Sequence, residues 1–347
     1  MFVINSNAIV SINKMTIANG FANYYWTMGG GGIENYGILS ITDSILFGNT
    51  ANLGGGIDNE GELTITNSKL LSNIAEDNNG FHPCGGGGIF NAGTLNITNS
   101  TLQGNTTECA YVTHANNGGA GIFNLGPFGA NVTLTKSRLL NNIAQNTDDG
   151  GGILNMAGGT ITIDQSELSS NLASNGGGIY NAGGDVITVN STLSGNSASW
   201  GGGIYNLDNL TVINSTLSNN QATTIGGIFN EGNSQIANSI IANSEGGDCY
   251  NSSNKFTIRS TLIEDGSCNP TWSGDPQLSL LANNGGPTLT HALLSGSIAI
   301  DNGDDAICIA KPVNNRDQRG IPRVSDRLTG SHCDIGAYEY QNRVIRR

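Results

Sequence analysis

The chain has 347 residues, of which 51 are glycine and 48 are asparagine, and charged residues make up only 12% of it. A hydrophobic fraction of 37% with so few charges excludes an intrinsically disordered chain, which stays unfolded through low hydrophobicity and high net charge. The net charge of -13 argues against binding to nucleic acid, because affinity for phosphates comes from clustered cations. No apolar run is long enough to form a membrane-spanning helix.

The charges are unevenly distributed along the chain. Residues 1–254 hold four lysine or arginine residues against 17 acids, whereas residues 255–347 hold ten of each kind. A break in composition of this size predicts two segments of different character that meet near residue 255.

A motif of the form GGGI-x-N occurs eight times, at intervals of 24 to 33 residues. Its isoleucines are Ile33, Ile57, Ile89, Ile122, Ile153, Ile179, Ile204 and Ile228. Between the motifs apolar and polar residues alternate, as at Leu63 and Ile65, which is the period of a β-strand. Glycine and asparagine enter left-handed backbone conformations at least cost, so they are expected at corners. Each unit therefore predicts three short strands and three corners.

One such unit is one coil of a parallel β-helix, because a coil cannot bury its inner face without neighbours above and below it. We predict an all-β fold: a right-handed parallel β-helix of about nine or ten coils over residues 1–263, with a C-terminal capping region over 264–347. The repeated asparagines are expected to form hydrogen-bonded ladders between coils. The glycine runs are interpreted as corners, since none is followed by the Lys-Ser or Lys-Thr of a phosphate-binding loop.

The N-terminal coil is predicted to be incomplete, because residues 12–22 already have the pattern of the second half of a coil. An open coil exposes unpaired backbone groups and an apolar cross-section. We therefore expect either that further native residues precede this coil or that the chain self-associates end to end through it.

The repeats and the tail resemble known bacterial families. The units LTITNSKLLSN at 63–73 and LNITNSTLQGN at 95–105 resemble polymorphic outer-membrane-protein repeats and right-handed parallel β-helix repeat proteins. The stretches GDPQLSLLANNGGPTLTHALLSGSIAID at 274–301, DQRGIPR at 317–323 and CDIGAYE at 333–339 resemble the choice-of-anchor Q domain of bacterial surface proteins. This resemblance implies an exported β-helix displayed on a cell surface.

The charged residues of the tail motifs are interpreted as structural. Arg319 is expected to pair with Asp334 or Glu339 across the capping region. No cofactor is expected, apart from one calcium alternative that depends on closely spaced oxygen ligands on a glycine-containing turn. The residues of this alternative site are Asp301, Asp304 and Asp305.

Six cysteines lie outside the regular strand patterns and predict three disulfides, although six cysteines allow 15 pairings. Pairing neighbours in sequence joins residues 25, 19 and 25 positions apart, which is about one coil each time. Residues one coil apart lie on successive rungs, so this pairing is geometrically natural. The expected bridges are Cys84–Cys109, Cys249–Cys268 and Cys308–Cys333. Disulfides indicate an oxidising, extracytoplasmic compartment, and we expect a secreted or cell-surface protein.

Two long inserts, at 74–84 and 106–117, leave successive coils at one corner and are expected to form a lobe, with a shorter insert at 143–149 on the next coil. Loops on a rigid scaffold commonly carry binding sites. The candidate binding residues of these inserts are His82, His114, Asp148 and Asp149. The alternative to a disulfide here is a zinc site, formed by the two histidines with Cys84 and Cys109.

The residue after each repeat isoleucine is expected to point outward, which predicts a column of large apolar side chains. From the third repeat on, its members are Phe90, Phe123, Leu154, Tyr180, Tyr205 and Phe229. Stacked at the spacing of the coils, such rings can contact sugar faces or another protein. The alternative is that the rings only pack on one another or lie beneath loops.

We therefore expect a non-catalytic adhesion module with a polysaccharide or another surface protein as its partner. The alternative is an extracellular polysaccharide lyase or glycoside hydrolase on the same fold. A glycoside hydrolase needs two facing carboxylates. The candidate pairs, Asp164 with Glu167 and Asp148 with Asp149, do not stand out from the other acids of the chain.

Overall fold

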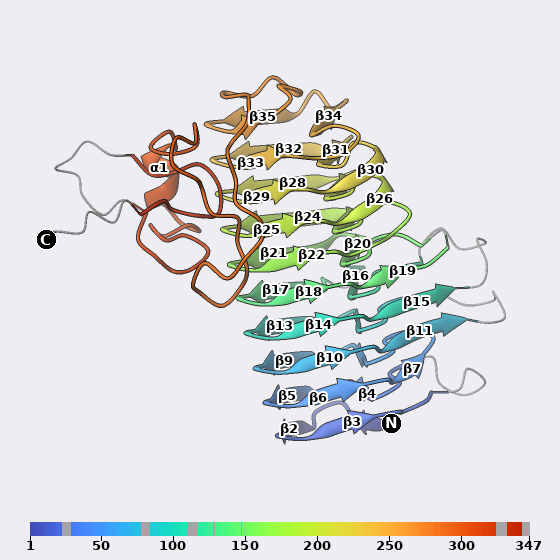
Figure 1. Ribbon diagram of the computed structural model, residues 1–347. Coiled ribbons are helices and arrows are strands. Elements are labelled where there is room, and N and C mark those ends of the chain that lie inside the picture. Colours follow the sequence, from blue (N-terminus) through green and yellow to red (C-terminus); the bar gives the residue numbers. More distant parts are fainter. Residues whose placement is uncertain are drawn as a thin grey trace, which may run out of the picture.

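The computed structural model describes residues 1–22, 29–77, 84–109, 117–127, 129–146, 148–323 and 332–341. Over these residues the chain is a right-handed parallel β-helix of ten coils, and three ten-stranded parallel sheets run along its length (Figure 1). The predicted fold class and number of coils are confirmed. Within the described part of the chain, no helix combines the length and the hydrophobicity needed to cross a membrane.

Each coil contributes one strand to each of the three long sheets, named sheets A, B and C here. Sheet A contains β1 (Phe2–Ile4), β4 (Ile33–Asn35), β8 (Ile57–Asn59), β12 (Ile89–Asn91), β16 (Ile122–Leu125), β20 (Ile153–Met156), β23 (Ile179–Asn181), β27 (Ile204–Asn206), β31 (Ile228–Asn230) and β34 (Cys249–Asn251). Sheet B contains β2 (Ile9–Asn13), β5 (Ile38–Thr42), β9 (Glu62–Thr66), β13 (Thr94–Thr98), β17 (Asn131–Thr135), β21 (Gly159–Asp164), β24 (Gly184–Val189), β28 (Asn209–Ile213), β32 (Asn233–Ala237) and β35 (Phe256–Arg259). Sheet C contains β3 (Thr16–Ala18), β6 (Ile45–Phe47), β10 (Lys69–Leu71), β14 (Thr101–Gln103), β18 (Arg138–Leu140), β22 (Glu167–Ser169), β25 (Thr192–Ser194), β29 (Thr216–Ser218), β33 (Ile240–Ala242) and β36 (Leu262–Ile263).

A fourth set of short strands, which the repeat pattern did not predict, lies between sheets C and A. These strands are β7 (Thr50–Ala51), β11 (Ile74–Asp77), β15 (Thr106–Cys109), β19 (Ile143–Ala144), β26 (Ser197–Trp200) and β30 (Gln221–Thr224). They arise where the chain between two corners is long enough to run extended beside the same segment of the next coil. The first residues of both long inserts thus belong to the scaffold itself.

Equivalent residues of successive coils pair in register, so identical side chains stack inside the solenoid. Leu63 pairs with Leu95, and Leu95 with Val132, along the inner face of sheet B. The resulting core extends from Ile4 to Ile263. Full burial of each such side chain contributes about 1.5–3 kcal/mol, so the stacked columns are the main source of stability.

The corners carry the expected glycines and, at the corner between sheets B and C, asparagine in five of the ten coils. Between sheets B and C every coil has one non-glycine residue in the left-handed conformation, with φ between 45° and 54°. These residues are Lys14, Asp43, Asn67, Asn99, Lys136, Gln165, Asn190, Asn214, Asn238 and Ser260. In the glycine runs, Gly86 has φ +68° and a Cβ there would lie 2.5 Å from the Ile89 carbonyl oxygen, so only glycine fits.

Two ladders of buried asparagine side chains connect the coils. The first consists of Asn35, Asn59, Asn91, Asn124, Asn155, Asn181, Asn206, Asn230 and Asn251, with bonds between neighbouring side chains of 2.7–3.0 Å. The second consists of Asn49, Asn73, Asn105, Asn142, Asn171, Asn196 and Asn220, with bonds of 2.9–3.0 Å. The predicted asparagine ladders are confirmed.

The C-terminal region covers more than the end of the solenoid. After β36 the chain returns across the last coil, where the Trp272 amide donates to the Thr261 carbonyl oxygen at 3.0 Å. It then runs beside sheet C, as the orange and red segments of Figure 1 show, and includes the short helix α1 (Asp305–Ile309). On this flank Gln318 contacts Thr192 at 2.6 Å and the Ser166 carbonyl oxygen at 3.2 Å. A lateral cover of the later coils was not part of the predicted end cap.

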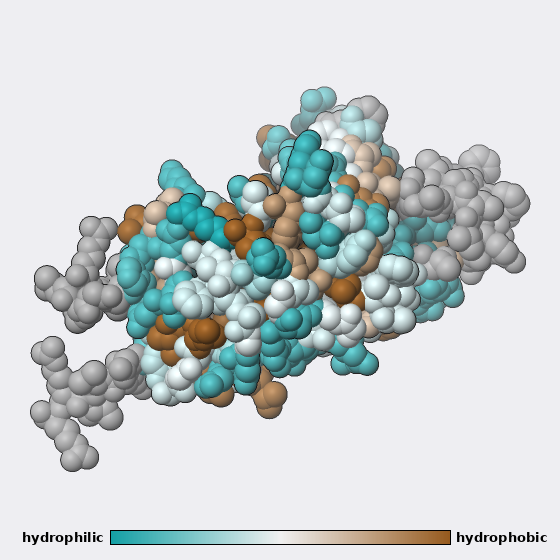
Figure 2. All heavy atoms as spheres, turned by 90° about the horizontal axis from the view of Figure 1, so that it is seen from above, coloured by the Kyte–Doolittle hydropathy of each residue, from teal (hydrophilic) through white to brown (hydrophobic). Residues whose placement is uncertain are grey.

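The C-terminal end of the solenoid is a mixed surface. Seen from above, hydrophobic and hydrophilic residues are interspersed over it (Figure 2). Cys268 in the returning segment packs against the end of the core. The apolar cross-section of the last coil is therefore covered by the chain's own residues.

The three predicted disulfides are present. They join Cys84–Cys109, Cys249–Cys268 and Cys308–Cys333, with Cα–Cα distances of 5.8, 5.8 and 6.7 Å. The zinc alternative is wrong, because the sulfurs of Cys84 and Cys109 are joined to each other. The two histidines of that alternative, His82 and His114, lie outside the described residues. Three disulfides are typical of proteins that fold in an oxidising compartment.

Candidate functional site

Sheet A presents one continuous column of outward-pointing side chains. In register from the first coil to the last, its members are Val3, Glu34, Asp58, Phe90, Phe123, Leu154, Tyr180, Tyr205, Phe229 and Tyr250. The column predicted from the sequence therefore exists. The column also extends to Tyr250, beyond the last glycine-rich motif. Two carboxylates, those of Glu34 and Asp58, occupy its positions before Phe90.

The first aromatic part of this column is buried. Phe90, Phe123 and Leu154 are only 6%, 1% and 1% exposed, and they form a small second core with Leu53 and Leu125. The expectation that Phe90 and Phe123 form part of an exposed binding surface is therefore wrong.

The residue five positions before each column member lies at the corner beside the column. For Phe90 and Phe123 these residues are Gly85 and Gly118, and a Cβ on Gly85 would lie 2.5 Å from the Phe123 ring. The ring thus rests against bare corner backbone. In the later coils the same corner position carries Asp149, Asn175 and Trp200, whose side chains occupy that space.

The later part of the column forms an aromatic ladder, defined here as Tyr180, Trp200, Tyr205, Phe229 and Tyr250. Ring centroids lie 5.1 Å apart for Tyr180 and Tyr205, 4.9 Å for Tyr205 and Phe229, and 4.7 Å for Phe229 and Tyr250. Trp200 packs perpendicular to Phe229 at 5.2 Å. Trp200 and Tyr250 are 44% and 42% exposed, Tyr180 and Tyr205 are half-buried, and Phe229 is the buried centre.

Sequence reasoning missed Trp200 because it lies outside the repeated motif. It ends β26, which pairs with β30, and Trp200 lies beside Thr224 in that pair. The signal that could have identified it is its constant offset of five residues before the column, the same offset that separates Asn175 from Tyr180.

The tyrosine hydroxyls of the ladder are available for a ligand. Among the described residues, those of Tyr180, Tyr205 and Tyr250 form no hydrogen bond. Burial, together with the charges of Asp149 and Glu231, raises the pKa of Tyr180 to about 12 and also raises that of Tyr205. These hydroxyls therefore remain protonated at neutral pH and can both donate and accept hydrogen bonds.

The two candidate acids of the third insert have different environments. Asp149 lies at the edge of the ladder, where its carboxylate accepts a 2.8 Å bond from Asn175. Asp148 is only 2% exposed, and its Oδ2 atom has no hydrogen-bond partner. Asp149 can therefore meet a ligand, whereas the expectation that Asp148 binds one is wrong because its side chain is enclosed.

Replacing Asp148 by asparagine should make the protein more stable at neutral pH but not in acid. Burial raises the pKa of Asp148 to about 6, which hydrogen bonds from Thr107 and Cys109 oppose only in part. The folded state therefore binds this proton more tightly than the unfolded chain does, and the resulting stability is lost as the pH rises through about 6. We expect a gain of up to about 3 kcal/mol at neutral pH that vanishes near about pH 4.

Thermal denaturation over this pH range measures the effect, with Asp43→Asn as the control at an exposed left-handed corner. A gain for Asp148→Asn that does not change with pH would contradict the assignment of a buried, ionised carboxylate.

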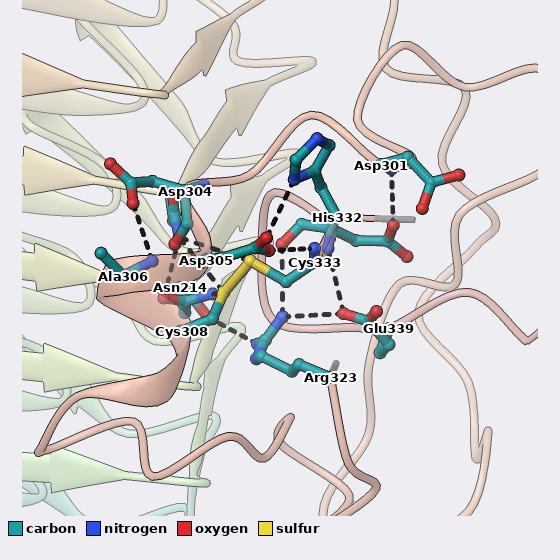
Figure 3. Close-up of a disulfide and its surroundings, with 12 residues drawn as sticks. Asn214, Asp301, Asp304, Asp305, Ala306, Cys308, Arg323, His332, Cys333 and Glu339 are labelled. Atoms are coloured by element: carbon teal, nitrogen blue, oxygen red, sulfur yellow. Dashed lines mark hydrogen bonds and ion pairs between the residues drawn. A yellow bond between two sulfur atoms is a disulfide. The ribbon is translucent and has the colours of Figure 1, made fainter. Parts of the chain in front are cut away.

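The calcium alternative is not supported by the positions of its residues. Asp304 caps α1 by accepting from the Ala306 amide at 2.9 Å, and it also pairs with Arg259. Asp305 accepts from the Cys333 amide at 2.9 Å, and the Asp301 side chain points away from both (Figure 3). In the part of the chain that the structure describes, there is no cluster of three or more histidine, cysteine, aspartate or glutamate side chains that could hold a metal ion.

The acids proposed for the enzyme alternative are not paired with each other. Glu167 is fully buried beneath the C-terminal region, where it bonds Arg138 at 2.8 Å and accepts from the Leu289 amide at 3.1 Å. Burial raises the pKa of Asp164. Glu167 is thus engaged in attaching the C-terminal region to sheet C.

A carboxylate pair that the sequence did not indicate lies at the start of the outward column. Glu34 and Asp58 pair in register and are 8% and 4% exposed. Glu34 accepts from the Tyr36 hydroxyl at 2.6 Å, while Oδ1 of Asp58 has no partner. Burial, with repulsion from Glu60 and Glu34, raises the pKa of Asp58 well above its usual range. A groove of about 450 Å³ beside them is lined by Tyr36 and Glu60 among others.

The tail charges pair differently from the expectation. Arg319 bonds Asp317 at 2.6 Å and also donates to the Glu339 carbonyl oxygen. The partner of the Glu339 carboxylate is instead Arg323, at 3.5 Å (Figure 3). Burial raises the pKa of Glu339 to about 9, and the charge of Arg323 only partly offsets this effect.

Comparison of the chain with protein-family models, with curated proteins and with solved structures finds no match in any of the three.

Proposed function

We propose that the chain is a secreted or cell-surface β-helix that binds carbohydrate without catalysis, through the aromatic ladder. The observation that carries this proposal is the row of contiguous, partly exposed aromatic rings with free hydroxyls along sheet A. Aromatic side chains with one apolar and one polar end are suited to sugars, which present C–H faces and hydroxyl groups together. Exposed apolar patches of this kind mark contact surfaces.

The spacing of the rings supports an extended polysaccharide as the ligand. Successive ring centroids of the ladder lie 4.7–5.1 Å apart along the solenoid axis. This spacing follows from the distance of about 4.8 Å between neighbouring strands, and it is close to the length of one pyranose unit in an extended β-1,4-linked chain. A polysaccharide lying parallel to the axis would therefore pass one rung per sugar and meet the partly exposed rings of Tyr180, Tyr205 and Tyr250, while Phe229 stays buried beneath it.

The scaffold supports binding because it holds the ladder rigid. The backbones of Tyr180, Tyr205 and Phe229 belong to three adjacent strands of sheet A. Their rings are already packed on one another, so little side-chain entropy is lost when a ligand binds.

Surface display is the second part of the proposal. It is supported by the three disulfides and by the resemblance of the 274–301, 317–323 and 333–339 strings to the choice-of-anchor Q domain of bacterial surface proteins. The repeats resemble polymorphic outer-membrane-protein repeats in the same way. Display on a surface would present the ladder to polysaccharides outside the cell.

Substituting Trp200 by alanine tests the proposal. On an array of neutral, acidic and amino oligosaccharides we expect the protein to bind at least one class. Calorimetric titration with the best binder should show a loss of about tenfold or more in affinity for Trp200→Ala and for Tyr205→Ala, since tenfold corresponds to about 1.4 kcal/mol.

Phe47→Ala is the matched control, because Phe47 is 46% exposed but lies in β6 of sheet C, away from the ladder. An unchanged affinity for both ladder variants would refute the assignment of the site. Release of reducing ends or unsaturated products from any bound polysaccharide would refute the non-catalytic part.

A further inference from the structure

The stretch of chain that carries the aromatic ladder has no positive side chain before Lys255, which follows Tyr250 by five residues. Residues 139–254 contain nine aspartate or glutamate residues and no lysine, arginine or histidine. This stretch includes every strand of the ladder, which are β23, β27, β31 and β34 in sheet A and β26 beside it. The nearest cation before this stretch, Arg138, lies in sheet C and is bound to Glu167 at 2.8 Å.

Two of these acids flank the ladder on opposite sides. On one side, Asp149 precedes Asn175 and Trp200 at the same corner in successive coils. On the other side, Glu231 follows β31 directly, two residues beyond Phe229, and its side chain is exposed. Glu231 begins the corner after β31, and the residues at the same offset in earlier coils, Leu125 and Met156, pack against the outward column.

Both acids act on the ladder electrostatically. Asp149 bonds Asn175, five residues before Tyr180, and Glu231 directly follows the strand of Phe229. In agreement with this placement, both charges contribute to the raised pKa of Tyr180 and of Tyr205. An anionic sugar on the ladder would be repelled by these charges, a neutral sugar would be little affected, and a cationic sugar would be attracted.

We propose that the aromatic ladder selects polysaccharides whose sugars carry protonated amino groups. The rings supply the contact surface, and Asp149 and Glu231 supply the charge complementary to the amines. This inference rests on the proposed carbohydrate binding and adds the class of sugar. Since Glu231 is exposed, the attraction should weaken as ionic strength rises.

Two oligosaccharides that differ only at the amine test the inference directly. Calorimetric titrations at low ionic strength compare the hexamer of β-1,4-linked glucosamine with the neutral hexamer of N-acetylglucosamine. They are carried out just above the pKa of about 6 to which burial raises Asp149, where this carboxylate is mostly ionised and part of the glucosamine amines is still protonated. We expect the glucosamine hexamer to bind about tenfold or more tightly. An oligogalacturonate of equal length should bind more weakly than either.

The double variant Asp149→Asn/Glu231→Gln keeps the shapes of both side chains and removes their charges. In this variant the affinity for the glucosamine hexamer should exceed that for the N-acetylglucosamine hexamer by no more than about two- to threefold. The affinity for the N-acetylglucosamine hexamer itself should stay the same. Asp185→Asn is the matched control, because Asp185 is an exposed acid on β24 of sheet B, on another face of the solenoid.

The outcomes separate this inference from the function on which it rests. If both hexamers bind equally and Trp200→Ala weakens both, the ladder binds sugar and only the selection of amines is overturned. If Trp200→Ala affects neither hexamer, the proposed function itself fails. If oligolysine of equal charge displaces the glucosamine hexamer with equal affinity, charge alone is recognised and the inference is also overturned.

Discussion

Replacing Asn142 by alanine is expected to lower the free energy of unfolding by at least about 3 kcal/mol. Its buried side chain accepts from the backbone and side-chain amides of Asn105 at 3.0 and 2.9 Å. It also donates to the Leu102 carbonyl oxygen at 3.1 Å and to Asn171 at 2.9 Å. Alanine leaves all of these buried groups without that partner, and each unsatisfied group costs about 1–3 kcal/mol.

Asn209→Ala provides the matched control for this prediction. Asn209 is also a strand asparagine within a ladder, with 2.8 Å bonds to Asp185 and Asn233, but these bonds are exposed. Water can replace them, so the expected loss is below about 1 kcal/mol. Chemical denaturation of both variants measures the difference. Equal losses would show that burial of the ladder is not what makes it stabilising.

Replacing Arg323 by methionine should release the C-terminal region from sheet C, with a loss of about 3–5 kcal/mol. The guanidinium is buried and donates to the Asn190 side chain at 3.0 Å and to the Gly336 carbonyl oxygen at 2.8 Å. It also faces the Glu339 carboxylate (Figure 3). Methionine fills a similar volume but leaves the Asn190 side-chain oxygen and the Gly336 carbonyl oxygen buried without their donor, and each such group costs about 1–3 kcal/mol.

Hydrogen exchange of the backbone amides in 275–323 and 332–341 measures this release. Exchange should accelerate there in Arg323→Met, while the amides of the first five coils remain protected. Arg316→Ala is the control, because Arg316 is exposed and, among the described residues, its side chain bonds only the Gly320 carbonyl oxygen, at 2.7 Å. Unchanged exchange in the C-terminal region of Arg323→Met would contradict the anchoring role of Arg323.

Much of the fold could be predicted because the same residue types recur at the same positions of each coil. The positions of Ile89 and Ile122, with the asparagines that follow each of them two residues later, fix strand, corner and register together. One-coil spacing of the cysteines likewise sufficed to predict all three disulfides. These features depend only on residues one coil apart, so sequence periodicity contains them.

The exposure of the outward column could not be predicted in the same way. Phe90 and Tyr205 occupy the same position of the repeat, yet Phe90 is buried and Tyr205 is half-exposed. Phe90 packs in a small core that includes the corner residue Leu53, whereas the corner beside Tyr205 carries Trp200. Neither Leu53 nor Trp200 belongs to the repeated motif. A prediction of the site needs these non-repeating residues as well as the column itself.

The anchoring of the tail was also beyond sequence reasoning. Arg319 and Arg323 are equally plausible partners for Glu339 when only the tail is considered. Arg323 occupies the buried position because Asn190, 133 residues away, accepts its hydrogen bond. Contacts between the tail and the solenoid of this kind carry no periodic signal.

The measurement that tests the central claim most directly is a nuclear magnetic resonance titration of the protein with ¹⁵N-labelled tryptophan side chains. On addition of the glucosamine hexamer, the indole signal of Trp200 should shift progressively, because its ring lies in the ladder and is 44% exposed. The indole signal of Trp272, which lies at the end of the solenoid beside Thr261, should stay in place. A Trp200 signal that does not move while the hexamer binds would contradict the account.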